Sequence, residues 1–240
     1  SFRYPHASED ELSNISFKIN KGQTLAIIGA TGSGKTTLIS LIPRFYDATE
    51  GEVLVDGVNV KNYKFDTLYD KLGYVTQKAV LFAGSIRKNV FFGESAAPET
   101  DEELKNAIEL SQAEEFVDKL PDGTEHMISQ MGRNVSGGQK QRLSIARALS
   151  RKPEILVFDD SFSALDYKTD AKLREGLNEK LKDTTKIIVA QRISTIRHAD
   201  KIIVLDRGEA VGMGTHEELM KNCDVYKEIA LSQLSAAELA

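Results

Sequence analysis

The residues best suited to chemistry lie in a glycine-rich loop near the N-terminus. Residues 29–36 read G-A-T-G-S-G-K-T and match the pattern G-x-x-x-x-G-K-[ST]. Glycines in this pattern let several backbone N–H groups face inward and bind phosphate oxygens. The Lys35 ammonium is expected to reach the β and γ phosphates, and the Thr36 hydroxyl to bind Mg²⁺, which prefers oxygen ligands. The predicted phosphate-binding residues are Gly29, Thr31, Gly32, Ser33, Gly34, Lys35, Thr36 and Thr37.

The segments on either side of this loop favour a nucleotide site over an ordinary glycine turn. The apolar run 25–28 predicts a buried strand entering the loop, and residues 37–45 have helical spacing with Pro43 marking a kink or an early end. A strand, a phosphate loop and a helix in this order are the context that the mechanism requires. An ordinary glycine turn would not require a strand before it and a helix after it.

A second candidate is a pair of carboxylates at the end of another apolar run. Residues 155–158 predict a buried strand, followed directly by Asp159 and Asp160. Ligands of α/β proteins bind beyond the carboxyl ends of the strands, so Asp159 is expected to lie near the Mg²⁺. A strand that ends in aspartate is common, and only its combination with Lys35 and Thr36 makes the assignment specific.

The elements that must position these residues alternate along the chain. Alternating polarity predicts that residues 15–20 form a strand paired with 25–28, and residues 81–151 are predicted to be mostly helical. This order predicts an α/β fold with a parallel core sheet and an inserted helical subdomain. Further predicted elements are strands at 53–56, 155–158, 187–190 and 202–205, a helix at 169–181, and two helices after residue 215.

Composition excludes several other classes of protein. With 240 residues, 41% hydrophobic and 28% charged, the chain can bury its own core, and a net charge of −5 argues against a broad nucleic-acid surface. Cys223 is the single cysteine, so no internal disulfide can form and a reducing compartment is expected. No run of about 18 apolar residues is present, and the start at Ser1 has the character of a cut end.

Two groups of residues are predicted to have structural rather than chemical roles. The histidines lack metal-ligand spacing and are expected at the surface or in structural contacts; they are His6, His126, His198 and His216. Basic residues between 137 and 150 are expected to form a solvated helix face; they are Lys140, Arg142 and Arg147.

A motif in the middle of the chain connects the phosphate loop to a known family. Residues 134–142 read N-V-S-G-G-Q-K-Q-R, and they lie between the phosphate loop and Asp159. This order resembles the nucleotide-binding domain of ATP-binding cassette (ABC) proteins over nearly the whole chain. The resemblance implies ATP and Mg²⁺ as ligands and an α/β P-loop NTPase core with a mixed, mostly parallel sheet and an N-terminal antiparallel β region. That core would comprise residues 1–80 and 152–240, and the helical subdomain residues 81–151.

The resemblance also implies roles for particular residues. Tyr4 would stack on adenine, and Gln77 would sense both Mg²⁺ and a transmembrane partner, with Thr36, Gln77 and Asp159 forming the metal group. The serine-glycine motif would reach the γ-phosphate bound by a second domain in a head-to-tail pair; its residues are Ser136, Gly137, Gly138 and Gln139. A simpler reading of Ser136 as a helix N-cap is compatible with this role. The D-loop would comprise Ser163, Ala164, Leu165 and Asp166.

Three further segments resemble the exporter branch of the family. They are residues 41–47 (L-I-P-R-F-Y-D), residues 81–86 with Asn89, and residues 214–219 (G-T-H-E-E-L). The branch implies a transmembrane domain in the same protein, a place at the cytoplasmic face of the cell membrane, membrane contact only through that domain, and no nucleic-acid partner. The short connection from Gln77 to Ser136 leaves no room for the coiled coils of chromosome-associated relatives.

Two positions depart from the pattern of active family members. Asp160 stands where they have the Glu that polarises the attacking water, and Gln191 stands where they have His. The aspartate carboxylate falls about 1.5 Å short, and a misplacement of about 1 Å can cost about a hundredfold in rate. Glutamine cannot become cationic as histidine can. The pair resembles the degenerate subunit of heterodimeric exporters, whose partner subunit has Glu and His. The alternatives are a homodimer in which Asp160 suffices as the base, and a soluble ABC ATPase without a transporter.

Overall fold

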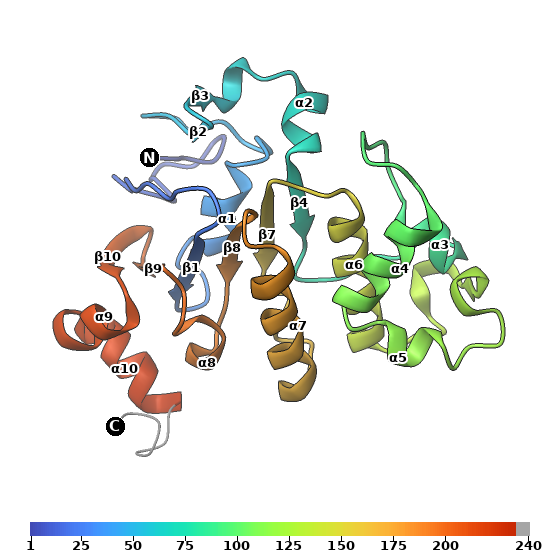
Figure 1. Ribbon diagram of the computed structural model, residues 1–240. Coiled ribbons are helices and arrows are strands. Elements are labelled where there is room, and N and C mark those ends of the chain that lie inside the picture. Colours follow the sequence, from blue (N-terminus) through green and yellow to red (C-terminus); the bar gives the residue numbers. More distant parts are fainter. Residues whose placement is uncertain (234–240) are drawn as a thin grey trace. The chain divides into compact units, whose positions relative to one another are not determined.

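The computed structural model describes residues 1–233 and divides into two compact units (Figure 1). The first unit contains residues 1–69 and 185–233, and the second contains residues 70–184. Among the helices of residues 1–233, none has both the length and the apolar character needed to cross a membrane.

The first unit is built on a four-stranded run of sheet (Figure 1). In spatial order its strands are β10 (Glu209–Gly214), β9 (Lys201–Asp206), β1 (Thr24–Gly29) and β8 (Thr185–Val189). β1 pairs in parallel with both β8 and β9, and β10 pairs antiparallel with β9. Apolar side chains of β1 and β9 are completely buried, as expected for strands covered on both faces. The predicted α/β class with a mostly parallel sheet is confirmed.

The expected strand at residues 15–20 is wrong. These residues form no strand, although the side chains of Ile15, Phe17 and Ile19 are more buried than those between them. Both edges of β1 are already occupied by β8 and β9, so no edge is left for an antiparallel neighbour. Alternating burial occurs in any extended segment that lies on a surface, whereas a strand also needs a backbone partner.

Short elements complete the first unit. They are α1 (Lys35–Ser40), β2 (Leu54–Val55), β3 (Val58–Asn59), η1 (Val60–Asn62), α2 (Phe65–Asp70), α8 (Ile193–Ile196), α9 (His216–Asn222) and α10 (Asp224–Gln233). β2 and β3 form an antiparallel hairpin. α1 ends three residues before Pro43, which confirms the early end. The two helices expected after residue 215 are confirmed as α9 and α10.

The second unit combines one parallel strand pair with a helical insertion. Its elements are β4 (Leu72–Val75), β5 (Gly84–Ser85), α3 (Ile86–Val90), α4 (Asp101–Leu110), α5 (Glu114–Val117), η2 (Gly123–Glu125), β6 (Met127–Ile128), η3 (Gln130–Gly132), α6 (Gly137–Ser150), β7 (Ile155–Asp159) and α7 (Tyr167–Lys180). β4 pairs in parallel with β7, and α6 packs on α3, α4 and β4. The helical character expected for residues 81–151 is confirmed, with a small β5–β6 pair added.

The basic residues of α6 do not form the solvated face that we expected. Arg147 donates to the main-chain oxygens of Asn89 at 2.7 Å and Val80 at 3.0 Å, and burial lowers the pKa of Arg147 to about 10. Arg142 and Lys140 also donate to carbonyl oxygens of nearby loops. Long side chains can bury their stems and still reach polar groups, which a count of charges along a helix does not reveal.

A half-buried histidine gives the first unit a predicted pH dependence. The His216 Nδ1 atom lies 2.7 Å from the Tyr226 hydroxyl, and burial, with a smaller contribution from Arg197, lowers the pKa of His216 below 6.5. The unfolded chain then binds the proton more readily, so the free energy of unfolding is expected to fall as pH drops below about 6.5. Urea unfolding at pH 7.5 and 5.5 measures this loss. His216→Gln should reduce it and His6→Gln, at an exposed site, should not; an equal loss in all three proteins would contradict the assignment.

Candidate nucleotide-binding site

The phosphate loop joins β1 directly to α1 in the first unit. Gly34 is the N-cap of α1 with φ 95°, a left-handed conformation that favours glycine. At Gly29 a Cβ atom would lie 2.1 Å from the main-chain oxygen of Leu205 on β9. Both glycines are therefore required by the backbone path itself. The loop can close tightly at the carboxyl end of β1 only because these two positions carry no side chain.

Lys35 extends across this loop. Its Nζ atom donates to the main-chain oxygens of Gly29 at 2.8 Å and Ala30 at 2.6 Å, and lies 3.5 Å from the Ser33 hydroxyl. The ammonium group is thus held against the first two residues of the loop. Backbone amides and a cation at the start of a helix are the donor set that suits a polyphosphate. A phosphate group could replace the carbonyl partners of Lys35 with stronger, charge-assisted hydrogen bonds.

The predicted base-stacking residue is close to the predicted phosphate site. The Tyr4 hydroxyl lies 2.9 Å from the hydroxyl of Thr37, a buried residue in the first turn of α1. The Tyr4 ring also meets the rings of Phe2 and Tyr46 edge to face. The structure therefore brings Tyr4 and Thr37 together, although 33 positions separate them in sequence.

Gln191 follows β8 in a loop that α10 holds from the C-terminal side. The Gln233 side chain donates to the Gln191 main-chain oxygen at 2.8 Å and accepts from the Ile193 N–H at 2.9 Å. One amide group thus binds the loop and the first residue of α8 at the same time. Sequence reasoning missed Gln233, because a glutamine at a helix end belongs to no motif.

The second unit carries the carboxylates and the glutamine. Asp159 ends β7 and is 5% exposed, and Asp160 follows it with φ 47° and is 6% exposed. The Gln77 side-chain amide donates to the Asp160 Oδ2 atom at 3.0 Å. Two residues that we predicted separately are therefore hydrogen-bonded to each other. This contact fixes the direction of the Asp160 carboxylate.

The predicted D-loop, residues 163–166, is hydrogen-bonded to the Asp160 backbone. The Ser163 hydroxyl donates to the Asp160 main-chain oxygen at 2.7 Å, and Leu165 is buried. Asp166 is the N-cap of α7 and accepts from the Thr169 N–H at 3.0 Å. Hydrogen bonds from Thr169 lower the pKa of Asp166, so this cap remains ionised at neutral pH.

The serine-glycine motif starts α6 with a complete capping box. The Ser136 hydroxyl accepts from the Gln139 N–H at 3.2 Å, and the Gln139 side chain accepts from the Ser136 N–H at 2.8 Å. The expected N-cap role of Ser136 is confirmed. Ser136 and Gly137 are exposed, and no atom lies within 4 Å of a Cβ built on Gly137. A role of this motif in another domain's site stays a prediction.

An α/β core with a phosphate loop between β1 and α1 defines a P-loop nucleotide-binding domain. A family model for ABC transporters matches residues 12–163, and the chain belongs to this family. It is 46% identical to an uncharacterized ABC transporter ATP-binding protein of Mycobacterium tuberculosis, over 99% of this chain and 40% of that protein. It is 42% identical to YgaD of Bacillus subtilis, named provisionally as a multidrug export ATP-binding/permease protein, over 95% of this chain and 39% of that protein.

A solved structure gives the same fold. The structure of a bacterial Atm1-family ABC exporter with ATP bound matches with a TM-score of 0.90 and 35% identity, covering 96% of this chain and 40% of that chain. The chain therefore spans about 40% of the length of the relatives it matches. The α/β P-loop fold of the ABC ATPases, with its mostly parallel sheet and helical insertion, is confirmed by this neighbour.

Proposed function

We propose that this chain is the ATP-binding domain of an ABC exporter and that it binds ATP with Mg²⁺. The observation that carries the proposal is the glycine-rich loop between β1 and α1, in which the Lys35 ammonium donates to the main-chain oxygens of Gly29 and Ala30 at 2.8 and 2.6 Å. Membership of the ABC transporter family and the likeness to an exporter with ATP bound support it.

The chain's own residues suit these ligands. The loop amides and Lys35 would hold the phosphates, and Tyr4 would stack on the base. Mg²⁺ would be held by the Thr36 hydroxyl with Gln77 and Asp159, whose oxygen atoms suit a hard cation. When bound, this ion neutralises charge on the phosphates. These assignments follow the order of motifs along the chain, as does our division into a core of residues 1–80 and 152–240 and a helical subdomain of residues 81–151.

The rest of the exporter would supply the membrane-spanning part. The name of YgaD combines an ATP-binding part with a permease, and this chain corresponds to 39% of that protein. We propose that the domain works at the cytoplasmic face of the cell membrane, attached to a transmembrane domain. ATP would join it head to tail with a second nucleotide-binding domain, and contacts available only in the closed pair would favour that state.

We further propose that this domain's own site hydrolyses ATP slowly. Asp160 is one methylene shorter than the glutamate it replaces, and its Oδ2 atom is engaged by Gln77. Gln191 cannot carry the positive charge of a histidine. The intact motif at Ser136 would complete the active site of a different partner subunit with Glu and His. A second candidate function is a homodimer that hydrolyses ATP by itself. The observation that favours it is the buried carboxylate of Asp160, which could still serve as a general base.

Replacing Lys35 tests the nucleotide site directly. Lys35→Ala is expected to weaken Mg·ATP binding at least about tenfold, because a charge-assisted contact to phosphate contributes on the order of 1.5–3 kcal/mol. Isothermal titration calorimetry of the purified chain measures the affinity. Lys21→Ala, at an exposed lysine outside the loop, is the matched control. Equal affinities of Lys35→Ala and wild type would contradict the proposal.

A further inference from the structure

We propose that Tyr46, held in place by a polar network around Arg44 and Lys61, is a positioning residue for Tyr4 and thereby sets the affinity for the base of the nucleotide. This inference rests on the proposed function, because it assigns a role within the same site. It concerns the base alone and leaves phosphate binding to the glycine loop.

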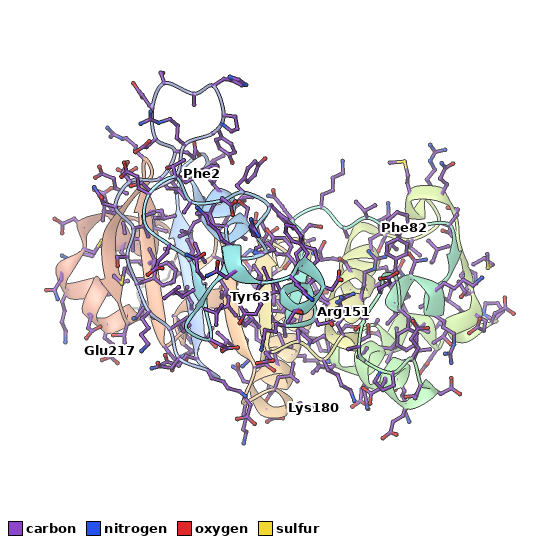
Figure 2. The ribbon with its side chains drawn as sticks, turned by 90° about the horizontal axis from the view of Figure 1, so that it is seen from above. Phe2, Tyr63, Phe82, Arg151, Lys180 and Glu217 are labelled. Carbon is purple, nitrogen blue, oxygen red and sulfur yellow. The ribbon has the colours of Figure 1, made fainter. Side chains whose placement is uncertain are left out.

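The first observation is a cluster of three aromatic rings. The Tyr4 and Tyr46 ring centres lie 5.2 Å apart at 88°, and the Tyr4 and Phe2 centres lie 4.8 Å apart at 81°. The Phe2 and Tyr46 rings are also in contact, at 5.4 Å, so each ring touches the other two. Phe2 is buried, and its position in the N-terminal segment is labelled in Figure 2. The Tyr4 side chain is therefore restrained twice: its ring contacts Phe2 and Tyr46, and its hydroxyl lies against the Thr37 hydroxyl.

The second observation is that the segment carrying Tyr4 is attached to the loop carrying Tyr46. The N–H groups of Thr49 and Glu50 donate to the Ser1 main-chain oxygen at 3.1 and 3.3 Å. The Ser1 amino group donates to the Glu50 main-chain oxygen at 3.1 Å. Because of these hydrogen bonds, residues 1–4 are expected to move together with residues 44–50. A displacement of that loop would therefore move Tyr4 away from Thr37.

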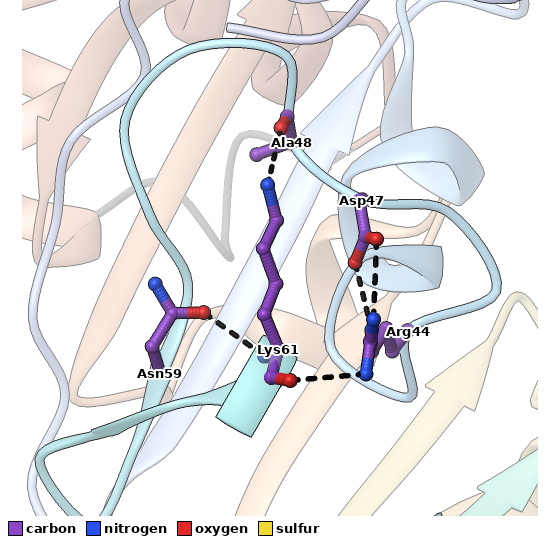
Figure 3. Close-up of polar contacts among 5 residues, drawn as sticks. All are labelled: Arg44, Asp47, Ala48, Asn59 and Lys61. Atoms are coloured by element: carbon purple, nitrogen blue, oxygen red, sulfur yellow. Dashed lines mark hydrogen bonds and ion pairs between the residues drawn. The ribbon is translucent and has the colours of Figure 1, made fainter. Parts of the chain in front are cut away.

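The third observation is the network that shapes this loop (Figure 3). Arg44 binds the Asp47 carboxylate at 2.9 and 3.4 Å and donates to the Lys61 main-chain oxygen at 3.2 Å. Lys61 in turn donates from Nζ to the Ala48 main-chain oxygen at 3.1 Å, while its own N–H is bound by Asn59. Arg44, the last residue of the turn at 41–44, has φ 60°, a left-handed conformation that surrounding contacts must maintain.

The exposure of Tyr46 indicates that its ring does not serve mainly to fill the core. Its side chain is 42% exposed, whereas Phe2 is 2% exposed. An exposed surface residue usually adds little to the stability of the fold. Its ring contacts Tyr4 and Phe2, and of these two only Tyr4 belongs to the proposed nucleotide site. Without the Tyr46 ring, Tyr4 would occupy its stacking position for a smaller fraction of the time, and the apparent affinity would fall by that fraction.

Two ligands separate base binding from phosphate binding. Mg·ATP and Mg·tripolyphosphate are titrated into the purified 240-residue chain by calorimetry. Tyr46→Ala is expected to weaken Mg·ATP about three- to tenfold and to leave Mg·tripolyphosphate unchanged, because only the base stacks on an aromatic ring. Tyr46→Leu, which keeps apolar bulk but lacks an aromatic ring, should weaken Mg·ATP binding as Tyr46→Ala does. Tyr46→Phe, which keeps the ring, should retain the wild-type affinity. Tyr167→Ala removes an exposed tyrosine of the second unit, outside both the ring cluster and the network around Arg44, and should change neither affinity.

A double-substitution cycle tests whether the effect passes through Tyr4. In a Tyr4→Ala background, Tyr46→Ala should cause no further loss of Mg·ATP affinity. Equal weakening of both ligands in Tyr46→Ala and Tyr46→Leu would mean a general disturbance and would overturn the inference. So would unchanged Mg·ATP binding in both variants. If the wild-type chain bound neither ligand, the proposed nucleotide site itself would be wrong. This result is distinguishable from the two outcomes above, which concern only the Tyr46 variants.

Discussion

Phosphate release by a protein carrying Asp160→Glu together with Gln191→His is expected to exceed that of the wild type by up to about a hundredfold, because the longer side chain would correct the proposed carboxylate misplacement of about 1 Å or more. The glutamate side chain would extend the carboxylate by one methylene toward an attacking water. The histidine would restore a group that can carry positive charge beside the γ-phosphate. Release of inorganic phosphate at saturating Mg·ATP measures the change.

The single variants show which departure matters more. Asp160→Glu alone should recover most of the gain if the position of the general base limits the rate. Asp160 is hydrogen-bonded to Gln77, so Gln77→Ala in the double variant reports whether this amide supports or restrains the longer carboxylate. Lys35→Ala in the double variant is the control and should abolish the gain. If the wild type already released phosphate as fast as the double variant, the slow-site proposal would be wrong and the homodimer favoured.

Replacing Arg147 with methionine is expected to lower the free energy of unfolding by about 2–4 kcal/mol, since hydrogen bonds of a charged group contribute about 1.5–3 kcal/mol and their loss leaves acceptors unpaired. The guanidinium binds the main-chain oxygens of Asn89 and Val80. It also lies 5.6 and 5.4 Å from the ring centres of Phe82 and Phe92, which stack on each other. The Arg147 side chain therefore connects α6 to residues 80–82 and 89–92 of the second unit.

Urea unfolding of the purified chain provides the measurement. Arg147→Lys keeps the charge but cannot reproduce the fork of the guanidinium, so it should recover only part of the loss. Lys172→Met, at an exposed position on α7, is the matched control and should change the free energy of unfolding by less than about 0.5 kcal/mol. An equal, small change in Arg147→Met and Lys172→Met would show that the buried contacts do not stabilise the unit.

Much of the core could be predicted because its signals are local. The apolar strands β1, β7 and β9 are recognisable from short runs of neighbouring residues, and the phosphate loop from eight. β4 was missed because it contains Gly73, a poor strand former. A Cβ at Gly73 would lie 2.9 Å from the Ala148 main-chain oxygen and 2.8 Å from the Leu156 side chain, so packing selects glycine there. β10 was missed because its largely exposed residues form no apolar run.

The sequence names candidate site residues but not most of their contacts. Tyr4, Gln77 and Asp160 were named from motifs, yet nothing in the sequence gives the hydrogen bonds of Tyr4 to Thr37 or of Gln77 to Asp160. Such contacts join positions 33 and 83 residues apart. Tyr46 belongs to a recognisable segment, but only the structure reveals that its ring lies against Tyr4.

The bond from Gln233 to the loop of Gln191 bears on how shortened versions of the protein are designed. Gln233 lies at the end of α10 and donates to the Gln191 main-chain oxygen at 2.8 Å. Trimming the C-terminus before this position, a common step in preparing samples for crystallography, would release the backbone beside a proposed catalytic position. Fragments for enzymology should therefore extend past residue 233, and fusion tags should be attached further downstream.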